Sequence, residues 1–365
     1  MDKSQFTRFS LIQPNNLQDI EKIWINFSLI SEPSFFQSWP FIKQVILSSQ
    51  ETSFYFLEIR NSHNLIIGLC LFGEQTKYHF LKKTTTYYLH QTGLPKKDQV
   101  YIEYNEPLFH PEHKMEALHH FMSFIQSKPL DHFILSGIKS SLYSILTEYL
   151  KINTLSEQSS YGVNLNQLRT SGQSYEDSLG KSTKRHLTKA KDHYKTLSLD
   201  FAQDENEATT YLLELAYLHN FSWRQRKITG AFENQDFLNF HLSLIKTTFQ
   251  QKKTHLVRVK GETEILGYFY FFDQNGVISY YQSGISYKAD GRIKPGLLAH
   301  AILIQYFLEN GKSFYDFMAG NLSYKEALGK KHEVLYWIEA NVTYIDKIRS
   351  IPTKIRNRLH PNPEE

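Results

Sequence analysis

Hydrophobic residues recur along the chain with two kinds of spacing. Some segments have the spacing of a helix and others the pattern of an extended strand. Ile20, Trp24 and Phe27 are three or four residues apart, as on one face of a helix, so a broken helical region is expected over 17–50. Further helices are expected at 113–126 and 140–150, and strands at 53–59, 65–72, 87–90, 100–104 and 133–136. The first two strands flank a short polar turn and are predicted to form a hairpin.

A polar, glycine-containing stretch at 164–175 separates this pattern from a second one and is the best candidate for a domain boundary. The second pattern predicts helices at 178–194, 207–223, 236–250 and 296–310, and strands at 255–260, 264–273, 277–283, 314–318 and 335–342. Helices and strands therefore alternate in both halves, which indicates a mixed α/β protein.

The two halves repeat one order of elements. Gly68 in the first hairpin and Gly267 in the second are each followed by Phe four residues later and by Gln seven residues later. The segments 124–137 and 307–320 each begin with Phe, end with Gly, and are interpreted as a helix end, a turn and a strand. We interpret the chain as two copies of one α/β unit.

The composition is that of a folded protein. Aromatic residues make up 15% of the 365 residues and hydrophobic residues 41%, which excludes a disordered chain. The formal net charge of +4 does not by itself indicate a nucleic-acid partner. No apolar run reaches the ~18 residues of a membrane span, and the N-terminus lacks the apolar core of a signal peptide. A cytoplasmic protein without a membrane span is expected.

Cys70 is the only cysteine, so a disulfide within the chain and a Cys-rich metal site are excluded. Cys70 falls in a predicted strand of the first half, which argues against acyl transfer through a thiol nucleophile. Histidines 110, 113, 119 and 120 cluster in the sequence, but no carboxylate or thiol motif at metal-ligand spacing accompanies them. No metal site is therefore expected.

The turn at 290–297 has the chemistry of a phosphate-binding loop. Arg292 and Lys294 add positive charge, and Gly296 allows the backbone to approach a ligand closely. Free N–H groups and the helix dipole favour an anion at the start of the following helix. The corresponding turn of the first half has no glycine and carries Glu112, so only the second half is expected to bind phosphate.

Several motifs follow one another in an order typical of a known enzyme family. The most specific is D-F-x-x-G-x-x-x-Y-K at 316–325. It follows a P-G-L-L helix start at 295–298 and the basic S-T-K-R-H at 182–186, and the first half contributes I-E-Y-N-E-P-L at 102–108. In these motifs, over about 35–345, the sequence resembles the BioF2-like (CelD-like) acetyltransferases of the GNAT superfamily. It is also similar in architecture to the Fem-type aminoacyl transferases, which carry two GNAT-like units.

The resemblance implies an α/β fold (an α+β mixed sheet) with two GNAT-like units in tandem. An N-terminal unit without cofactor would span 1–165 and an acyltransferase unit 166–345, followed by a basic polar tail at 346–365. The implied enzyme is a bacterial N-acyltransferase that uses acetyl-CoA or another acyl-CoA and no metal. It would move the acyl group, expected to be acetyl, to a small-molecule or peptidic acceptor. An amine of that acceptor would attack the acyl-CoA directly.

The resemblance also implies a set of site residues. Asp316, Tyr324 and Lys325 are the expected catalytic residues, since an Asp can accept the amine proton and a Tyr can protonate a departing thiolate. A turn role for Asp316 and a packing role for Tyr324 are the alternatives. Residues expected to contact acyl-CoA are Tyr281, Ser283, Arg292, Lys294, Gly296 and Leu297. The alternatives are core packing for Tyr281, solvated loop charges for Arg292 and Lys294, and an ordinary helix start for Gly296 and Leu297. Residues expected to bind the acceptor or a phosphate are Trp223, Arg226, Lys184 and Arg185, with core packing and a solvated helix face as the alternatives.

Two other functions remain open from the sequence. A Fem-type enzyme would take its acyl group from an aminoacyl-tRNA, which the basic helix at 178–194 permits, although no long heptad arm is present. The general GNAT pyrophosphate signature is present only in a shorter P-G form, so a degenerate GNAT pair that serves as a binding module or scaffold is the third hypothesis.

Overall fold

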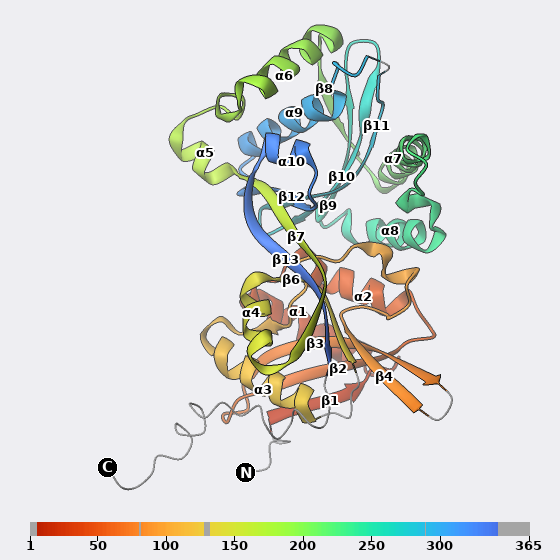
Figure 1. Ribbon diagram of the computed structural model, residues 1–365, viewed down its shortest axis with the longest axis vertical. Coiled ribbons are helices and arrows are strands. Elements are labelled where there is room, and N and C mark those ends of the chain that lie inside the picture. The colour runs from red at the N-terminus through yellow and green to blue at the C-terminus, as the bar shows by residue number, and fades with distance from the viewer. Residues whose placement is uncertain (1–5, 80–81, 128–131, 289, 342–365) are drawn as a thin grey trace.

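The structure, a computed structural model, describes residues 6–79, 82–127, 132–288 and 290–341. The tail expected at 346–365 lies outside these residues. Helices cover both faces of one large mixed sheet, and the N-terminal and C-terminal halves lie at opposite ends of the molecule (Figure 1). Among the described helices, none is both long and apolar enough to cross a membrane.

The first half contains the strands and helices of one unit. They are β1 (Thr7–Leu11), α1 (Leu17–Ser31), α2 (Trp39–Leu47), β2 (Ser53–Arg60), β3 (Ile66–His79), β4 (Lys82–Leu89), the 3-10 helix η3 (Lys97–Val100), β5 (Leu108–Phe109), the 3-10 helix η4 (Pro111–His113), α3 (Lys114–Ser127), β6 (His132–Lys139), α4 (Ser140–Tyr149) and β7 (Lys151–Asn164).

The second half repeats that order. Its elements are α5 (Leu165–Ser171), α6 (Lys181–Tyr194), β8 (Ser198–Phe201), α7 (Glu205–Gln225), α8 (Gln235–Thr248), β9 (Thr254–Lys260), β10 (Ile265–Gln274), β11 (Val277–Ile285), α9 (Pro295–Glu309), β12 (Phe314–Ala319), α10 (Ser323–Leu328) and β13 (Lys330–Asn341).

The order of strands in the sheet has an internal symmetry. Within the described residues it is β1-β2-β3-β4-β6-β13-β7-β12-β11-β10-β9-β8, with β5 paired to β3 off this path. Apart from β5, each strand of the first half has a counterpart at the mirrored position. The last strands of the two halves are exchanged, because β13 pairs with β6 and β7 pairs with β12. These two strands also pair with each other and run between the two ends of the molecule (Figure 1). The symmetry confirms the repeat that the sequence predicts.

Three hydrophobic clusters stabilise the fold, and one of them crosses between the halves. It joins α1 and α2 of the first half to α7, α8 and β10 of the second, with the rings of Phe35 and Phe272 stacked at 3.9 Å. The other two lie under α3 and α4 and between α6, α9 and the second half of the sheet. Burying large aromatic side chains contributes on the order of 2–3 kcal/mol each, so the shared cluster ties the halves together.

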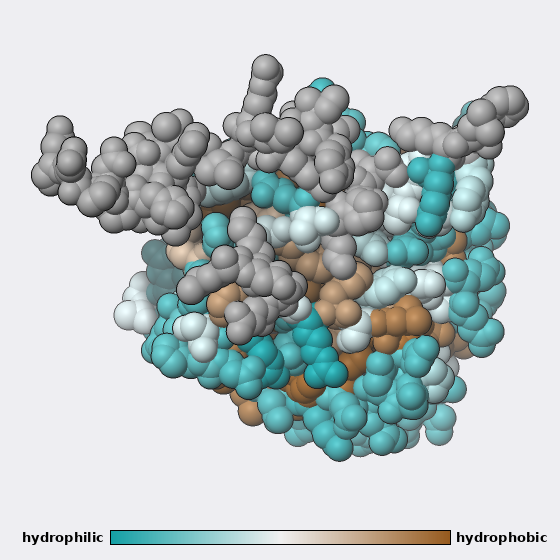
Figure 2. Space-filling view, turned by 90° about the horizontal axis from the view of Figure 1, so that it is seen from below, coloured by the Kyte–Doolittle hydropathy of each residue, from teal (hydrophilic) through white to brown (hydrophobic). Residues whose placement is uncertain are grey.

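Most predicted elements are confirmed, with two differences. The strand expected at 100–104 is wrong, because Tyr101 and Tyr104 adopt left-handed backbone angles (φ 45° and 50°) and the segment forms an irregular connection. The polar stretch expected as a linker is preceded by the long strand β7 and contains α5. Seen from the N-terminal end, hydrophobic residues gather in the central area, and hydrophilic residues lie along the lower edge and the right-hand side (Figure 2).

Helix α7 approaches β11 so closely that Gly284 leaves no room for a side chain. A Cβ atom at this position would lie 2.3 Å from the carbonyl oxygen of Leu215 and 2.9 Å from its Cα. Because backbone must move to relieve this overlap, Gly284→Ala is expected to reduce the free energy of unfolding by about 1–3 kcal/mol. Urea unfolding followed by circular dichroism measures the change. Gly291→Ala is the matched control, since nothing lies within 4 Å of its Cβ position and no loss is expected.

Candidate active site

Two neighbouring parallel strands of the second half separate at the middle of the sheet. β11 and β12 pair only from Val277 opposite Phe314 to Ser279 opposite Asp316. Beyond this point β11 continues to Ile285 and β12 to Ala319 without pairing with each other, so the strands open into a V. An extended ligand can lie between two strands that separate in this way, as in strand addition.

Helix α9 begins next to the open end of this V. The first helical hydrogen bond to the turn is made by the Leu298 N–H, which leaves the preceding N–H groups of Gly296 and Leu297 for an anion. A Cβ at Gly296 would lie 2.7 Å from Cδ1 of Ile285, so glycine allows the close approach of α9 to β11. Lys294 is exposed beside this site, which fits the phosphates of a nucleotide. Arg292 is instead held by Asp290, with Nη2 2.7 Å from Oδ2.

The basic helix α6 flanks the same turn. The charge of Lys189 contributes to a pKa of about 2 for Asp290, after the larger effect of the hydrogen bond from Arg292. Arg185 lies one helical turn before Lys189 and is exposed. Lys184 is half-buried and donates to the carbonyl oxygen of Asp177 at 3.1 Å. The structure therefore brings a basic helix close to the proposed phosphate site.

The corresponding V of the first half is filled by the protein itself. β4 and β6 pair from Thr86 opposite His132 to Tyr88 opposite Ile134 and then separate. Asn105 lies between them, because its backbone N–H donates to the Gly137 carbonyl at 3.1 Å and its Nδ2 donates to the Leu89 carbonyl at 3.0 Å. Nδ1 of His90 lies 2.6 Å from Oδ1 of Asn105. The irregular segment 101–107 thus closes the first V.

The segment 101–107 also places side chains at the end of β12. Polar groups from both halves meet there, and we call this group the junction cluster. Its members come from the segment 101–107, β7, β12, α10 and β13, and they are Glu103, Tyr104, Ser160, Asp316, Lys325 and His332. Glu103, Ser160, Asp316 and Lys325 are buried, whereas His332 is exposed at the side of the cluster nearest solvent. Buried ionisable groups of this kind are costly unless they are paired, and they are concentrated at functional sites.

Asp316 holds the strand end and the cluster together. Its Oδ1 accepts from the backbone N–H of Met318 at 2.7 Å and from the hydroxyl of Ser160 at 3.2 Å, and it lies 3.3 Å from Nε2 of His332. Ser160 also lies 2.6 Å from the hydroxyl of Tyr104. Because Met318 has a left-handed φ of 62°, the hydrogen bond to Asp316 fixes a bend at the end of β12.

Lys325 and Glu103 complete this strand end with opposite charges. The ammonium group of Lys325 donates to the carbonyl oxygens of Met318 at 3.1 Å and Ala319 at 2.6 Å. Oε2 of Glu103 accepts from the N–H of Ala319 at 2.8 Å. Burial raises the pKa of Glu103 to about 8, although Lys325 and the Ala319 N–H oppose the shift. Burial lowers the pKa of Lys325 despite the two nearby carboxylates.

Tyr324 lies apart from the junction cluster, in the hydrophobic cluster formed with α9. Its ring stacks on His300 with centroids 5.8 Å apart, and it shares a side-chain hydrogen bond with Tyr280 of β11. Burial raises the pKa of Tyr324, and the neighbouring Tyr280 adds to the shift. The phenol pair connects β11 to α10.

A third group of expected residues lies at the end of β11. The Ser283 hydroxyl lies 2.6 Å from that of Tyr280, and the Ser283 carbonyl lies 3.1 Å from Nδ1 of His219. The Arg226 guanidinium is placed over the rings of Trp223 (5.5 Å) and Tyr287 (5.6 Å), which attaches the end of α7 to the loop after β11.

Tyr281 points away from these groups. Its hydroxyl donates to the Val100 carbonyl of the first half at 2.5 Å and lies 3.1 Å from Nε2 of His241. Only the backbone of Tyr281 is therefore left to face the V. This contact adds a further link between the two halves.

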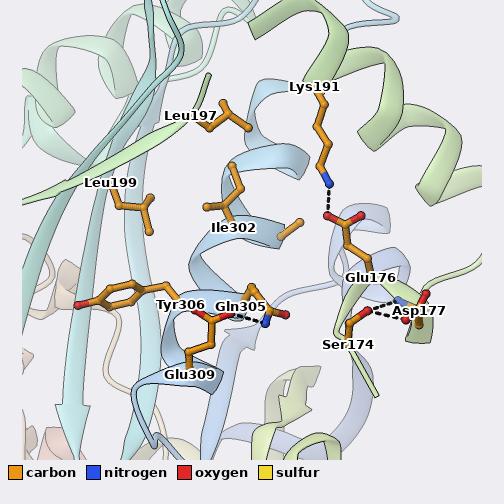
Figure 3. A pocket seen from close by; sticks show the side chains of 11 residues that line it. Ser174, Glu176, Asp177, Lys191, Leu197, Leu199, Ile302, Gln305, Tyr306 and Glu309 are labelled. Carbon is orange, nitrogen blue, oxygen red and sulfur yellow. Dashed lines mark hydrogen bonds and ion pairs between the residues drawn. The ribbon is translucent and has the colours of Figure 1, made fainter. Parts of the chain in front are cut away.

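A separate surface pocket of about 570 Å³ lies between α6, β8 and the outer face of α9 (Figure 3). Leu197, Leu199 and Ile302 form its apolar side, and the ion pair of Glu176 with Lys191 forms its polar side. None of the site residues expected from the sequence lines it.

The two halves have the fold of two GNAT-like units in tandem. Residues 178–326 match the sequence model of the Acetyltransferase (GNAT) domain. No curated protein matches the sequence.

Solved structures share the whole architecture at low sequence identity. FemX is 8% identical, with a TM-score of 0.56 over 97% of this chain and 100% of that one. L-PGS from Bacillus licheniformis is 13% identical, with a TM-score of 0.51 over 90% and 94%. A protein of unknown function from Bacteroides thetaiotaomicron is 10% identical, with a TM-score of 0.51 over 91% and 99%. These likenesses concern the fold alone, and they confirm the expected Fem-like architecture.

Proposed function

We propose that the chain is an N-acyltransferase that transfers an acyl group, with acetyl as the simplest case, from acyl-CoA to an amine. The observation that carries the proposal is the open V between β11 and β12, with α9 beginning beside it. An extended pantetheine arm fits between the separated strands. The pyrophosphate fits the free N–H groups of Gly296 and Leu297, with Lys294 beside them.

Glu103 is the base that we assign to this reaction. A carboxylate with a pKa near 8 suits proton removal from an amine near neutral pH. The amine nitrogen forms a bond to the thioester carbon, the C–S bond breaks, and the amine proton passes to Glu103. A backbone N–H of β11 polarises the thioester carbonyl. Tyr324, whose phenol retains its proton, donates to the departing thiolate.

Asp316 and Lys325 act in this scheme by holding the strand end. Asp316 was the expected base from the sequence, but three polar groups surround its Oδ1 and one of them is the N–H of Met318. We therefore assign it to positioning. Trp223 and Arg226 lie beside the end of β11, where an acceptor would enter. The acceptor is specified only as an amine.

Calorimetric titration with acetyl-CoA tests the proposal. One molecule is expected to bind per chain, because Asn105 and its neighbours occupy the V of the first half. Lys294→Glu places a negative charge beside the phosphates and is expected to raise Kd about tenfold, equivalent to ~1.4 kcal/mol. Lys246→Glu on α8 is the matched charge reversal and is expected to leave Kd unchanged. Absence of binding to acetyl-CoA and to longer acyl-CoA would reject the proposal.

A Fem-type transfer from aminoacyl-tRNA is the second candidate, and the position of α6 favours it. The exposed basic residues of this helix flank the phosphate site and would suit a polynucleotide backbone as well as a nucleotide. Binding of charged tRNA whose affinity falls steeply with salt, together with no binding of acyl-CoA, would support this candidate over the first.

A further inference from the structure

Histidine and glutamate side chains gather in a short segment of the first half that the proposed reaction does not use. The segment 110–120 contains four of the 16 histidines of the chain and two glutamates. From the sequence alone no carboxylate could be matched to these histidines. The fold decides which of the side chains meet, because the segment turns from β5 into α3.

Three of these side chains converge where the chain enters α3. The ligand atoms that His110, Glu112 and His113 can offer all lie within 4.8 Å of one another. The His110 and His113 rings have centroids 5.1 Å apart. In a tetrahedral zinc site with Zn–N bonds of about 2.0–2.1 Å, ligand atoms are roughly 3.3 Å apart, so the side chains must rotate towards one another to bind a metal. His110 and His113 are half-buried and Glu112 is exposed, which leaves access from solvent.

Glu116 adds a second carboxylate one turn further along α3. Its Oε2 lies 3.2 Å from Nδ1 of His113, and its Oε1 lies 4.0 Å from Nε2 of His120. Metal-binding histidines usually present their second nitrogen to a carboxylate, which fixes the tautomer and the orientation of the ring. Glu116 can fill that role for His113, or it can provide a fourth ligand.

The backbone already holds the ligand positions. The N–H of His110 donates to the Ile67 carbonyl at 2.9 Å, which attaches the segment to the sheet. Pro111 begins the 3-10 helix η4 (Pro111–His113), and the His110 side chain accepts from the Glu112 N–H at 3.3 Å. A metal bound to either nitrogen of His110 replaces this hydrogen bond, because the other nitrogen then carries the proton. The fixed backbone of the turn still lowers the conformational entropy that metal binding costs.

The internal symmetry gives this turn a contrasting counterpart. The turn before α9 carries Lys294 and Gly296 and suits an anion, whereas the turn at the mirrored position before α3 carries histidines and glutamates. The positive end of a helix dipole disfavours a cation, but the carboxylates of Glu112 and Glu116 in the first turns offset this effect. The two halves therefore present opposite ligand chemistry at equivalent places.

We propose that His110, Glu112 and His113 form a binding site for one zinc-type divalent cation, with Glu116 as the supporting carboxylate. Imidazole nitrogen with carboxylate oxygen suits Zn²⁺, and Ni²⁺ and Co²⁺ accept the same donors. The bound ion would attach the end of β5 to α3. This inference does not depend on the acyltransferase proposal.

Zinc titration of the full-length protein, without a histidine tag and after treatment with chelator, tests the site. Calorimetry is expected to show one bound Zn²⁺ per chain and thermal unfolding a higher Tm with zinc present. Glu116→Gln is expected to weaken binding by roughly 10- to 100-fold, as loss of an outer-shell partner does, and His113→Ala by more. The absorption spectrum of the Co²⁺ form reports whether the site is tetrahedral.

His119→Ala is the matched control, because His119 lies in α3 close to the converging set but does not belong to it. It is expected to leave zinc affinity and Tm unchanged. Each variant is also compared without metal by circular dichroism, so that a folding defect is separated from loss of a ligand. No stoichiometric zinc binding, or binding that survives both His110→Ala and His113→Ala, would overturn the proposal.

Discussion

Replacing Glu103 by Gln is expected to lower kcat for acyl transfer by roughly 10²- to 10⁴-fold, the usual contribution of a positioned general base. The amide keeps the size of the side chain and can still accept from the Ala319 N–H through its oxygen, but it cannot take up a proton. Steady-state assay of free CoA release measures the loss. Binding of acetyl-CoA is expected to be unchanged, because Glu103 does not belong to the phosphate site.

The pH dependence gives this prediction a signature that a structural defect would not produce. In the unmodified protein kcat/KM is expected to rise with pH through about 8, as Glu103 loses its proton. Glu103→Gln removes this rise, and Glu103→Asp retains part of it. Glu106→Gln is the matched control from the same segment, with no expected effect. An unchanged profile in Glu103→Gln would place the base elsewhere, with Asp316 the next residue to test.

Stability has the opposite dependence on pH. The unfolded chain releases the proton of Glu103 near its ordinary pKa of about 4.3, whereas the folded protein keeps it until about pH 8. Between these values the folded state binds the extra proton, so this group makes the free energy of unfolding fall as the pH rises. Glu103→Gln is expected to flatten the fall. The variant would then be inactive and yet more resistant to unfolding at alkaline pH.

The sequence predicts the repeated unit but not the exchange of strands between the halves. The echoes at Gly68 and Gly267 and at Gly137 and Gly320 mark equivalent places in the two units, because they reflect local turn chemistry. The exchange of β7 and β13 depends on pairing between segments more than 150 residues apart, for which the chain carries no local signal. The strand β7 is not predicted from the sequence either, because its many polar residues do not show the hydrophobic pattern of a strand.

The sequence predicts the candidate site only where its residues are close together along the chain. Asp316 and Lys325 belong to one motif, and their meeting follows from a single turn after β12. Glu103 meets them from the other half of the chain, and its only signal is the E-Y-N stretch at 103–105, which resembles a family motif without showing what it contacts. In the structure, the first and last residues of that stretch make separate contacts. Asn105 fills the first V, and Glu103 reaches the strand end beside the second.

This arrangement explains why the first half retains the fold of an acyl-binding unit without an open V. A strand pair that separates exposes backbone groups that need partners. In the second half a ligand can satisfy them, whereas in the first half Asn105 does so permanently through Gly137 and Leu89. The segment held in this way has a fixed geometry, so the first half can position a side chain in the site of the second.

Lys325→Met is expected to reduce the free energy of unfolding by about 1–3 kcal/mol, because it removes a buried ammonium group that donates to two buried carbonyls. The change leaves the Glu103 and Asp316 carboxylates without a cation and the Met318 and Ala319 carbonyls without their donor. Chemical unfolding at pH 8 measures the loss. The loss is expected to shrink at pH 5, where Glu103 holds its proton in the folded protein. Lys330→Met, on the exposed start of β13, is the matched control and is expected to change stability little.

The double variant Glu103→Gln with Lys325→Met separates the electrostatic interaction between these two residues from the hydrogen bonds that Lys325 donates. If Glu103 and Lys325 act as a pair, Glu103→Gln with Lys325→Met is expected to be less destabilised than the sum of the single variants, by about 0.5–3 kcal/mol. Gln is uncharged, so it needs no cation in the buried cluster. Strictly additive effects would mean that Lys325 serves only the carbonyls at the end of β12. The charge of Glu103 would then be stabilised by the Ala319 N–H alone, and the assignment of a proton-accepting role to Glu103 would lose its electrostatic support.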